Sequence, residues 1–145
     1  MTDEPQTLTL AIIKPDAFGS CRAGRVLAAL EEAGFGIRGA RVIRLSTGAA
    51  EAFYAVHRER PFYRSLVEFM TSGPCMPLAL EHDRAVPYLR EVIGATDPAE
   101  AEPGTIRALY AESKERNAIH ASDSPENART ELGFFFSAAD LIDAG

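Results

Sequence analysis

One histidine near the C-terminal end, His120, stands in the segment NAIHASDS among small and polar side chains. Its neighbours Ala121 and Ser122 are too small to cover an imidazole ring, so a bulky group could approach it. An imidazole nitrogen with a free lone pair is a nucleophile that can form a covalent intermediate. His120 is therefore the first candidate for chemistry in this chain.

A glutamate further along, Glu131, has the helical spacing of the apolar residues Ala128, Leu132 and Phe135. A carboxylate in the apolar stripe of a helix is costly unless a partner bonds it. If one ring nitrogen of His120 donates to Glu131, the tautomer is fixed and the other nitrogen keeps its lone pair. The same pair could also be purely structural, and the two residues alone leave both interpretations open.

Cationic side chains border a long loop and follow an apolar strand. Lys14 comes directly after that strand, Arg90 precedes the loop, Arg107 closes it, and Thr96 lies between the two arginines. Guanidinium groups and a hydroxyl suit the oxygens of a phosphate. Taken alone, each residue fits an exposed surface position better than a binding role, and only their grouping around one loop suggests a site.

The other two histidines give weaker signals. His82 stands in the acidic turn EHDR and is expected to be solvated. His57 stands in HRERP, where it is either a surface residue or a contact for an anion.

Apolar periodicity and turn residues divide the chain into strands and helices. Thr7–Ile13 is apolar at nearly every position, which predicts a central strand buried on both faces. Further strands are predicted at Ile37–Leu45, Cys75–Leu80 and Ala118–His120. Helices are predicted from Ala23 to a cap at Gly34, at Ala49–Arg58, from Pro61 to Gly73, over Tyr88–Ile93, and after the capping residue Ser124.

The order of these elements predicts an α+β, ferredoxin-like split βαβ sandwich with a four-stranded antiparallel sheet and helices covering one face. The long, mostly irregular stretch from Gly94 to Asn117 precedes the last strand, with one short turn at Ile106–Tyr110. Such a loop in a compact domain is usually functional. We expect one domain over residues 1–145, with a core of about 7–136 and a tail at 137–145.

Composition excludes several classes. Apolar residues make up 46% and charged residues 25%, which is typical of a soluble globular protein, and no apolar run approaches the ~20 residues of a membrane span. The start MTDEPQT lacks the features of a signal peptide. The net charge of −6 argues against a general nucleic-acid binder. Two isolated cysteines, Cys21 and Cys75, predict reduced thiols and a cytoplasmic protein.

The segment from Gly34 to Gly39 matches the dinucleotide-binding pattern G-x-G-x-x-G. That fingerprint requires a strand before the glycines and a helix after them. Here the order is reversed, so we interpret Gly34 as a helix cap and Gly36 as part of a turn.

Six motifs in sequence order resemble the nucleoside diphosphate kinase family. They are AIIKPDA at Ala11–Ala17, FYAVHRERPFY at Phe53–Tyr63, LVEFMTSGP at Leu66–Pro74, LREVIGATDP at Leu89–Pro98, PGTIRALYAES at Pro103–Ser113 and NAIHASDS at Asn117–Ser124. The resemblance implies transfer of the γ-phosphate of ATP or another nucleoside triphosphate to a nucleoside diphosphate, which maintains nucleotide pools. It also implies a ping-pong route through a phosphohistidine, Mg²⁺ held mainly by the nucleotide, and a homo-oligomer that is a tetramer or a hexamer.

The same resemblance implies roles for particular residues. His120 would be the nucleophile through Nδ1, Glu131 would hold its ring, Ser122 would bond nearby, and Tyr54 would lie beside Lys14 and the histidine. The implied nucleotide contacts are Lys14 and Asn117 on the ribose, Arg90, Thr96 and Arg107 on the outer phosphates, His57 on the inner phosphate, and Phe62 on the base. Asp123 would reach the metal through water.

Four positions depart from the family pattern. Ala121 replaces a usual glycine, Ser20 a frequent basic residue, Leu109 a common aspartate, and Lys114 an apolar residue near the base. None removes an implied catalytic group. Two other hypotheses from different classes remain: a regulatory module that binds nucleotides without turnover, and an RNA-binding sheet, for which the chain lacks basic charge and aromatic strands.

Overall fold

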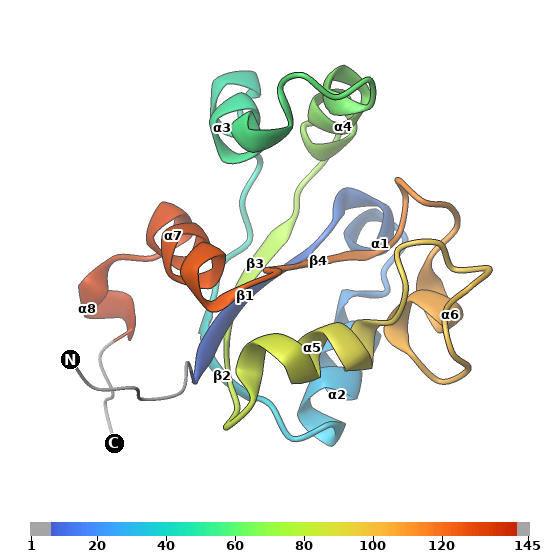
Figure 1. Cartoon of the computed structure of the whole chain (residues 1–145), viewed down its shortest axis with the longest axis vertical. Coiled ribbons are helices and arrows are strands. Elements are labelled where there is room, and N and C mark those ends of the chain that lie inside the picture. The colour runs from blue at the N-terminus through green and yellow to red at the C-terminus, as the bar shows by residue number, and fades with distance from the viewer. Residues whose placement is uncertain (1–6, 142–145) are drawn as a thin grey trace.

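The computed structural model describes residues 7–141, which form a sheet with helices packed around it (Figure 1). In chain order the elements are β1 (Leu8–Ile13), α1 (Pro15–Gly19), α2 (Ala23–Glu32), β2 (Gly36–Ala40), α3 (Thr47–Phe53), the 3-10 turn η1 (Ala55–His57), α4 (Tyr63–Met70), β3 (Met76–Glu81), α5 (Ala85–Ile93), α6 (Ile106–Tyr110), β4 (Ile119–Ala121), α7 (Pro125–Phe135) and α8 (Ala138–Leu141).

The sheet has the strand order β2-β3-β1-β4, and every neighbouring pair is antiparallel. Strand β1 is central, so Ile12 lies opposite Pro77 on one side and His120 on the other. This topology confirms the predicted ferredoxin-like, α+β arrangement. It also places His120 on a short strand directly beside the most buried strand of the sheet.

Helices cover both faces of the sheet, not one. Leu10 and Ile12 of β1 pack into a core with α3, α4 and α7, whereas Ala11 and Ile13 pack into a second core with α2, α5 and α6. Figure 1 shows these two groups on opposite sides of the strands. The prediction of one covered face was wrong because β1 carries apolar side chains on both of its faces, and both must be buried against helices.

Several boundaries differ from the predicted ones. Proline ends β1 as predicted, but Pro15 also begins the short helix α1, which was not predicted. The helix predicted at Ala49–Arg58 ends at Phe53 and continues as η1. The strand predicted to reach Leu45 ends at Ala40, and beyond it the pairing continues only irregularly, through a hydrogen bond from the Arg41 amide to the Pro77 carbonyl and an isolated bridge from Ile43 to Cys75.

The glycine-rich match and the tail are both explained by the fold. Helix α2 precedes Gly34, whose φ is +102°, and β2 follows, so the reversed order of helix and strand is confirmed. The placement of Gly36 in the turn was wrong, because Gly36 is the first residue of β2. In the tail, α8 contacts β2, and Leu141 packs against the core that contains Leu10. The last four residues, 142–145, lie outside the described part of the chain.

Two further sequence predictions are tested by the fold. Cys21 is exposed, Cys75 is buried, and both are free thiols. Ser124 caps α7 by accepting a hydrogen bond from the Asn127 amide at 3.0 Å. Within residues 7–141, no helix has the length and apolar character needed to cross a bilayer.

The long loop after α5 begins at Gly94, which has φ +87° and ψ −178°. This backbone region is essentially restricted to glycine. A Cβ at Gly94 would also lie 2.5 Å from the Thr105 hydroxyl oxygen, so the two ends of the loop approach closely there. Gly104 likewise has a positive φ, +89°, but open space around it.

We expect Gly94→Ala to destabilise the protein more than Gly104→Ala. The second change adds only left-handed backbone strain, about 1–2 kcal/mol. Gly94→Ala would instead place a Cβ in collision with Thr105 and force alanine into a backbone conformation that it does not adopt. Free energies of unfolding from urea titration would measure both losses, and equal losses would contradict the close approach at Gly94.

Candidate active site

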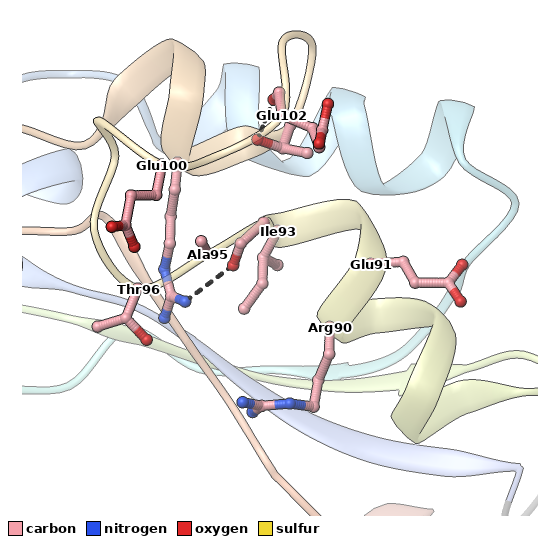
Figure 2. Close-up of a pocket in the computed structure, with 10 residues that line it drawn as sticks. Arg90, Glu91, Ile93, Ala95, Thr96, Glu100 and Glu102 are labelled. Carbon is pink, nitrogen blue, oxygen red and sulfur yellow. Dashed lines mark hydrogen bonds between the residues drawn. The ribbon is translucent and has the colours of Figure 1, made fainter.

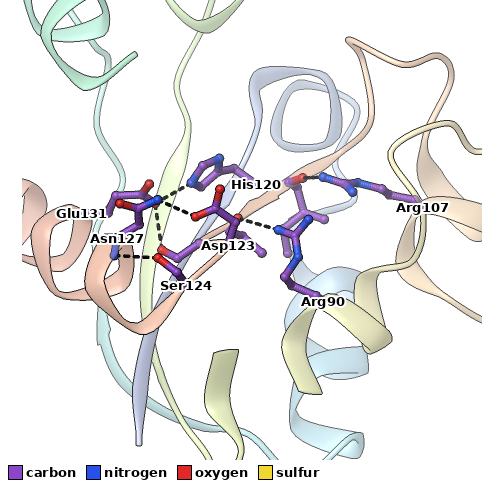
Figure 3. Close-up of polar contacts among 10 residues, drawn as sticks. Arg90, Arg107, His120, Asp123, Ser124, Asn127 and Glu131 are labelled. Carbon is purple, nitrogen blue, oxygen red and sulfur yellow. Dashed lines mark hydrogen bonds and ion pairs between the residues drawn. The ribbon is translucent and has the colours of Figure 1, made fainter. Parts of the chain in front are cut away.

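The centre of the site is a bond between β4 and α7. His120 Nε2 lies 2.7 Å from Glu131 Oε1 (Figure 3). A carboxylate can only accept, so Nε2 carries the proton and Nδ1 keeps its lone pair. Within the described part of the chain, no hydrogen bond to Nδ1 is found. The predicted pairing is therefore confirmed, and it leaves one nitrogen free.

Ser122 and the backbone fix the glutamate in turn. The Ser122 hydroxyl donates to the same Glu131 oxygen at 2.8 Å, and the Ser122 amide donates to Leu10 of β1 at 3.1 Å. The His120 and Glu131 side chains are 20% and 21% exposed. The ring is thus oriented by a partly buried network and can still be reached from solvent.

Two aromatic side chains pack against the histidine. Phe53 meets the His120 ring edge-on, with centroids 5.4 Å apart, and Tyr54 lies at 6.2 Å. The Tyr54 hydroxyl is buried without a partner in the described chain, and burial raises its pKa, so it remains a neutral donor. Tyr54 lies beside the histidine, which is one of the two neighbours that the resemblance gave it, whereas the contact of Phe53 was missed. The only sequence signal for it was the adjacent pair Phe53-Tyr54 at the end of a helix.

Lys14 occupies the turn after β1 and is buried. Its ammonium donates to the Asn117 side-chain oxygen at 2.8 Å, which joins two residues that the resemblance assigned to one ribose. Burial, and then repulsion by Arg107, lower the pKa of Lys14 to about 8, while Asp16 and Glu115 oppose the shift. Lys14 is therefore a cation whose charge is sensitive to pH near neutrality.

Two arginines bracket the strand that carries the histidine. Arg107 is buried and donates to the backbone carbonyls of Ile119 at 2.8 Å and Gly94 at 3.1 Å. Arg90 is exposed and donates to the carbonyl of Ala121 at 3.3 Å (Figure 3). Burial, and then repulsion by Arg90, lower the pKa of Arg107 to about 10. The guanidinium groups thus lie close together, and their mutual repulsion favours an anion between them.

A pocket of about 470 Å³ opens beside these arginines (Figure 2). Arg90, Thr96 and Arg107 line it together, as the loop prediction required, with Glu91, Glu100 and Glu102 also in its wall. The Nε atom of Arg107 is buried and has no partner among the described residues. Its hydrogen-bonding capacity is therefore unused, although the atom itself is covered by protein.

His57, Phe62 and Asp123 are less directly connected to this centre. The rings of His57 and Phe62 contact each other, with centroids 5.4 Å apart, on the arm formed by α3, η1 and α4. Phe62 is 45% exposed, so its face is available for stacking. Asp123 is exposed and accepts a hydrogen bond from the Asn127 side chain. No group of three His, Cys, Asp or Glu residues in the described chain could hold a metal ion.

His82 remains partly exposed beside a turn, as expected, but its ring is also packed against aromatic side chains. Its ring stacks on Tyr88, with centroids 4.4 Å apart, and also contacts Phe35. Its Nδ1 accepts the Arg84 amide at 3.0 Å. The charged residues of EHDR concealed this packing, although Tyr88 follows nearby in α5 and only Phe35 comes from a distant part of the sequence.

Comparison with known proteins gives the family. The family model described as nucleoside diphosphate kinase matches residues 7–141. A nucleoside diphosphate kinase of Chlorobium limicola is 54% identical over 92% of this chain and 96% of its own length. One from Halorhodospira halophila is 53% identical over 92% of this chain and 94% of its own length.

Solved structures agree. A nucleoside diphosphate kinase of Aquifex aeolicus superimposes with a TM-score of 0.91 at 45% identity, covering 94% of this chain and 99% of that one. A halophilic nucleoside diphosphate kinase of Halobacterium salinarum, solved in complex with CDP, gives 0.91 at 33% identity, covering 97% and 93%. The chain belongs to the nucleoside diphosphate kinase family. It is a phosphotransferase that moves phosphate between nucleoside tri- and diphosphates.

We expect the affinity for ATP to weaken as the pH rises through about 8, the pKa of Lys14 in the free protein. The ammonium form attracts phosphate, and a bound polyanion raises the pKa of that ammonium. Affinity should then fall by up to about tenfold per pH unit above this value. Calorimetric titration of wild type and Lys14→Met across this range would measure it. Parallel pH profiles for the two proteins would contradict the assignment.

Proposed function

We propose that this protein transfers the γ-phosphate by a ping-pong mechanism through a phosphohistidine on Nδ1 of His120, and that it maintains nucleoside and deoxynucleoside triphosphate pools in the cytoplasm. The observation that carries the proposal is the bond from Nε2 to Glu131, which leaves Nδ1 as the only nucleophilic atom of the ring. One site then serves donor and acceptor in turn, because the histidine stores the phosphate between them.

The chemistry needs only the free lone pair and an in-line phosphate. Nδ1 attacks the γ-phosphorus, a nitrogen–phosphorus bond forms, and the bond to the β–γ bridging oxygen breaks, which releases the nucleoside diphosphate. The ring gains positive charge in this step, and the Glu131 carboxylate at Nε2 stabilises it. Ser122 keeps that carboxylate in place. The second half-reaction is the reverse with another diphosphate.

The nucleotide would lie across the residues that surround His120. Lys14 and Asn117, already paired, would hold the ribose, and Lys14 would also lie close to the transferred phosphate, with Tyr54 beside it and His120. Arg90, Thr96 and Arg107 would hold the outer phosphates in the pocket that they line. His57 would contact the inner phosphate and Phe62 would stack on the base. Stacking on one aromatic face accepts any base, which fits an enzyme for all nucleotides.

Mg²⁺ is the proposed cofactor, bound mainly by the nucleotide phosphates. The site fits this arrangement because its cations and exposed Asp123 form no metal-binding cluster of their own within the described chain. Asp123 would contact the ion through water. When bound, the ion would neutralise charge on the phosphates during transfer.

We also propose that the protein is a homo-oligomer, a tetramer or a hexamer. Strand β2 lies at an edge of the sheet, and Ile37 and Val42 expose apolar side chains on and just beyond it. An exposed apolar edge strand is a surface that pairs readily with another chain.

Incubation with radiolabelled ATP and Mg²⁺ without an acceptor tests the proposal against a nucleotide-binding module without turnover. We expect the protein to carry a label that is lost in acid, survives in base, and passes to any nucleoside diphosphate added later. His120→Ala should carry none. A His120→Ala protein that still labels and turns over would remove the assignment, and an unlabelled wild type would favour the binding module.

We expect Glu131→Ala to slow phosphate transfer by about 10- to 100-fold, because the ring loses its orientation. The dissociation constant for nucleotide should change little, since the phosphate contacts remain. Single-turnover rates and equilibrium binding would separate the two effects. Glu126→Ala on the same helix, an exposed position, is the matched control. Equal losses of rate and affinity in Glu131→Ala would count against an orienting role.

A further inference from the structure

The residue before β4 has an unusual backbone. Ala118 is fully buried and has φ +73°, in the left-handed region that alanine rarely adopts. The Ile119 amide donates to the Asn117 carbonyl at 2.9 Å, which closes a tight turn over Ala118. Turns with this hydrogen bond and a positive φ are rare and strained, and they persist only when their surroundings hold them.

Both backbone groups of Ala118 are held by the segment that follows β1. The Asp16 side-chain oxygen Oδ2 accepts the Ala118 amide at 3.0 Å, and the Lys14 amide donates to the Ala118 carbonyl at 2.8 Å. Asp16 lies in α1, and Figure 1 shows this helix beside the segment that leads into β4. The other carboxylate oxygen of Asp16 is buried and has no partner among the described residues.

The strained turn lies between two groups of the proposed site. Asn117 on one side pairs with Lys14, and on the other side β4 begins and carries His120. Rotation of Ala118 to a relaxed conformation would turn the start of β4 and move both side chains. Displacement of a reacting group by about 1 Å can cost about 100-fold in rate.

We propose that Asp16 is a positioning residue for phosphate transfer: its carboxylate holds the strained turn at Ala118 and so fixes His120 and Asn117 in place. The inference rests on the proposed role of His120. It assigns a function to a residue for which the family resemblance implied none.

An effect of charge must be separated from this effect of geometry. Asp16 and Glu115 both place negative charge near Lys14. Only Asp16 bonds Ala118, whereas Glu115 accepts the Ser65 hydroxyl at 2.9 Å. Asp16→Asn and Glu115→Gln each remove a charge but retain an oxygen acceptor, so they form a matched pair.

The test is the rate of His120 phosphorylation from ATP in a single turnover. We expect Asp16→Ala to lose about 10- to 100-fold, by analogy with other groups that orient a reacting residue. Asp16→Asn should retain most of the rate because its oxygen still accepts the Ala118 amide. A wild-type rate in Asp16→Ala would overturn the proposal. The proposal would also be overturned if Asp16→Asn and Glu115→Gln were both phosphorylated as slowly as Asp16→Ala, because loss of charge alone would then explain the effect.

A second comparison tests the turn itself. Glycine adopts positive φ without strain, so Ala118→Gly removes the tendency of the turn to relax. The factor by which Asp16→Ala slows His120 phosphorylation should therefore be smaller in the Ala118→Gly background than in the wild-type background. An equal loss in both backgrounds would show that Asp16 acts by another route.

Hydrogen exchange keeps the proposal testable if Asp16→Ala does not fold. The Ala118 amide of the wild-type protein should be strongly protected, and exchange at the rate of an unprotected amide would overturn the proposal. Wild-type labelling separates this failure from that of the proposed function. If wild type forms no phosphohistidine, the proposed function fails, whereas normal labelling with an unaffected Asp16→Ala refutes only the role of Asp16.

Discussion

The site depends on one hydrogen bond, from Nε2 of His120 to Oε1 of Glu131. It joins the last strand to the last long helix and sets which ring nitrogen is free. The carboxylate would be costly in its partly buried position without the imidazole and the Ser122 hydroxyl. The bond therefore stabilises the packing of β4 against α7, and it leaves Nδ1 of His120 without a hydrogen bond among the described residues, as the proposed nucleophilic role requires.

The cations around this bond are held close together by the backbone. Arg107 and Arg90 donate to carbonyls on either side of His120, and Lys14 is anchored by Asn117. The pKa values of Lys14 and Arg107 are lowered by burial and by neighbouring positive charge. Repulsion of this kind weakens the protein without a ligand and is relieved when a polyanion binds. The site thus favours a triphosphate electrostatically, although the whole chain carries a net charge of −6.

Features carried by local sequence were predictable. The apolar run of β1, the helix start at Ser124 and the helical spacing of Glu131 are such features, and together they predicted the fold and the central pair. Features that depend on contacts with distant segments of the chain could not be predicted from local sequence. Nothing around Ala118 signals a left-handed residue, because alanine has no preference for that conformation and the partner that holds it lies in α1. The stack of His82 on Tyr88 was missed for another reason: Tyr88 is close in sequence, but the charged residues Asp83 and Arg84 between them favoured a solvated histidine.

The most direct measurement is the position of the phosphate on the ring of His120. Phosphorylated protein, digested in base, can be examined by phosphorus NMR and mass spectrometry against the two phosphohistidine isomers. The bond to Glu131 predicts phosphate on Nδ1 alone. Phosphate on Nε2, or on another residue while His120 stays unmodified, would contradict the account of how this site works.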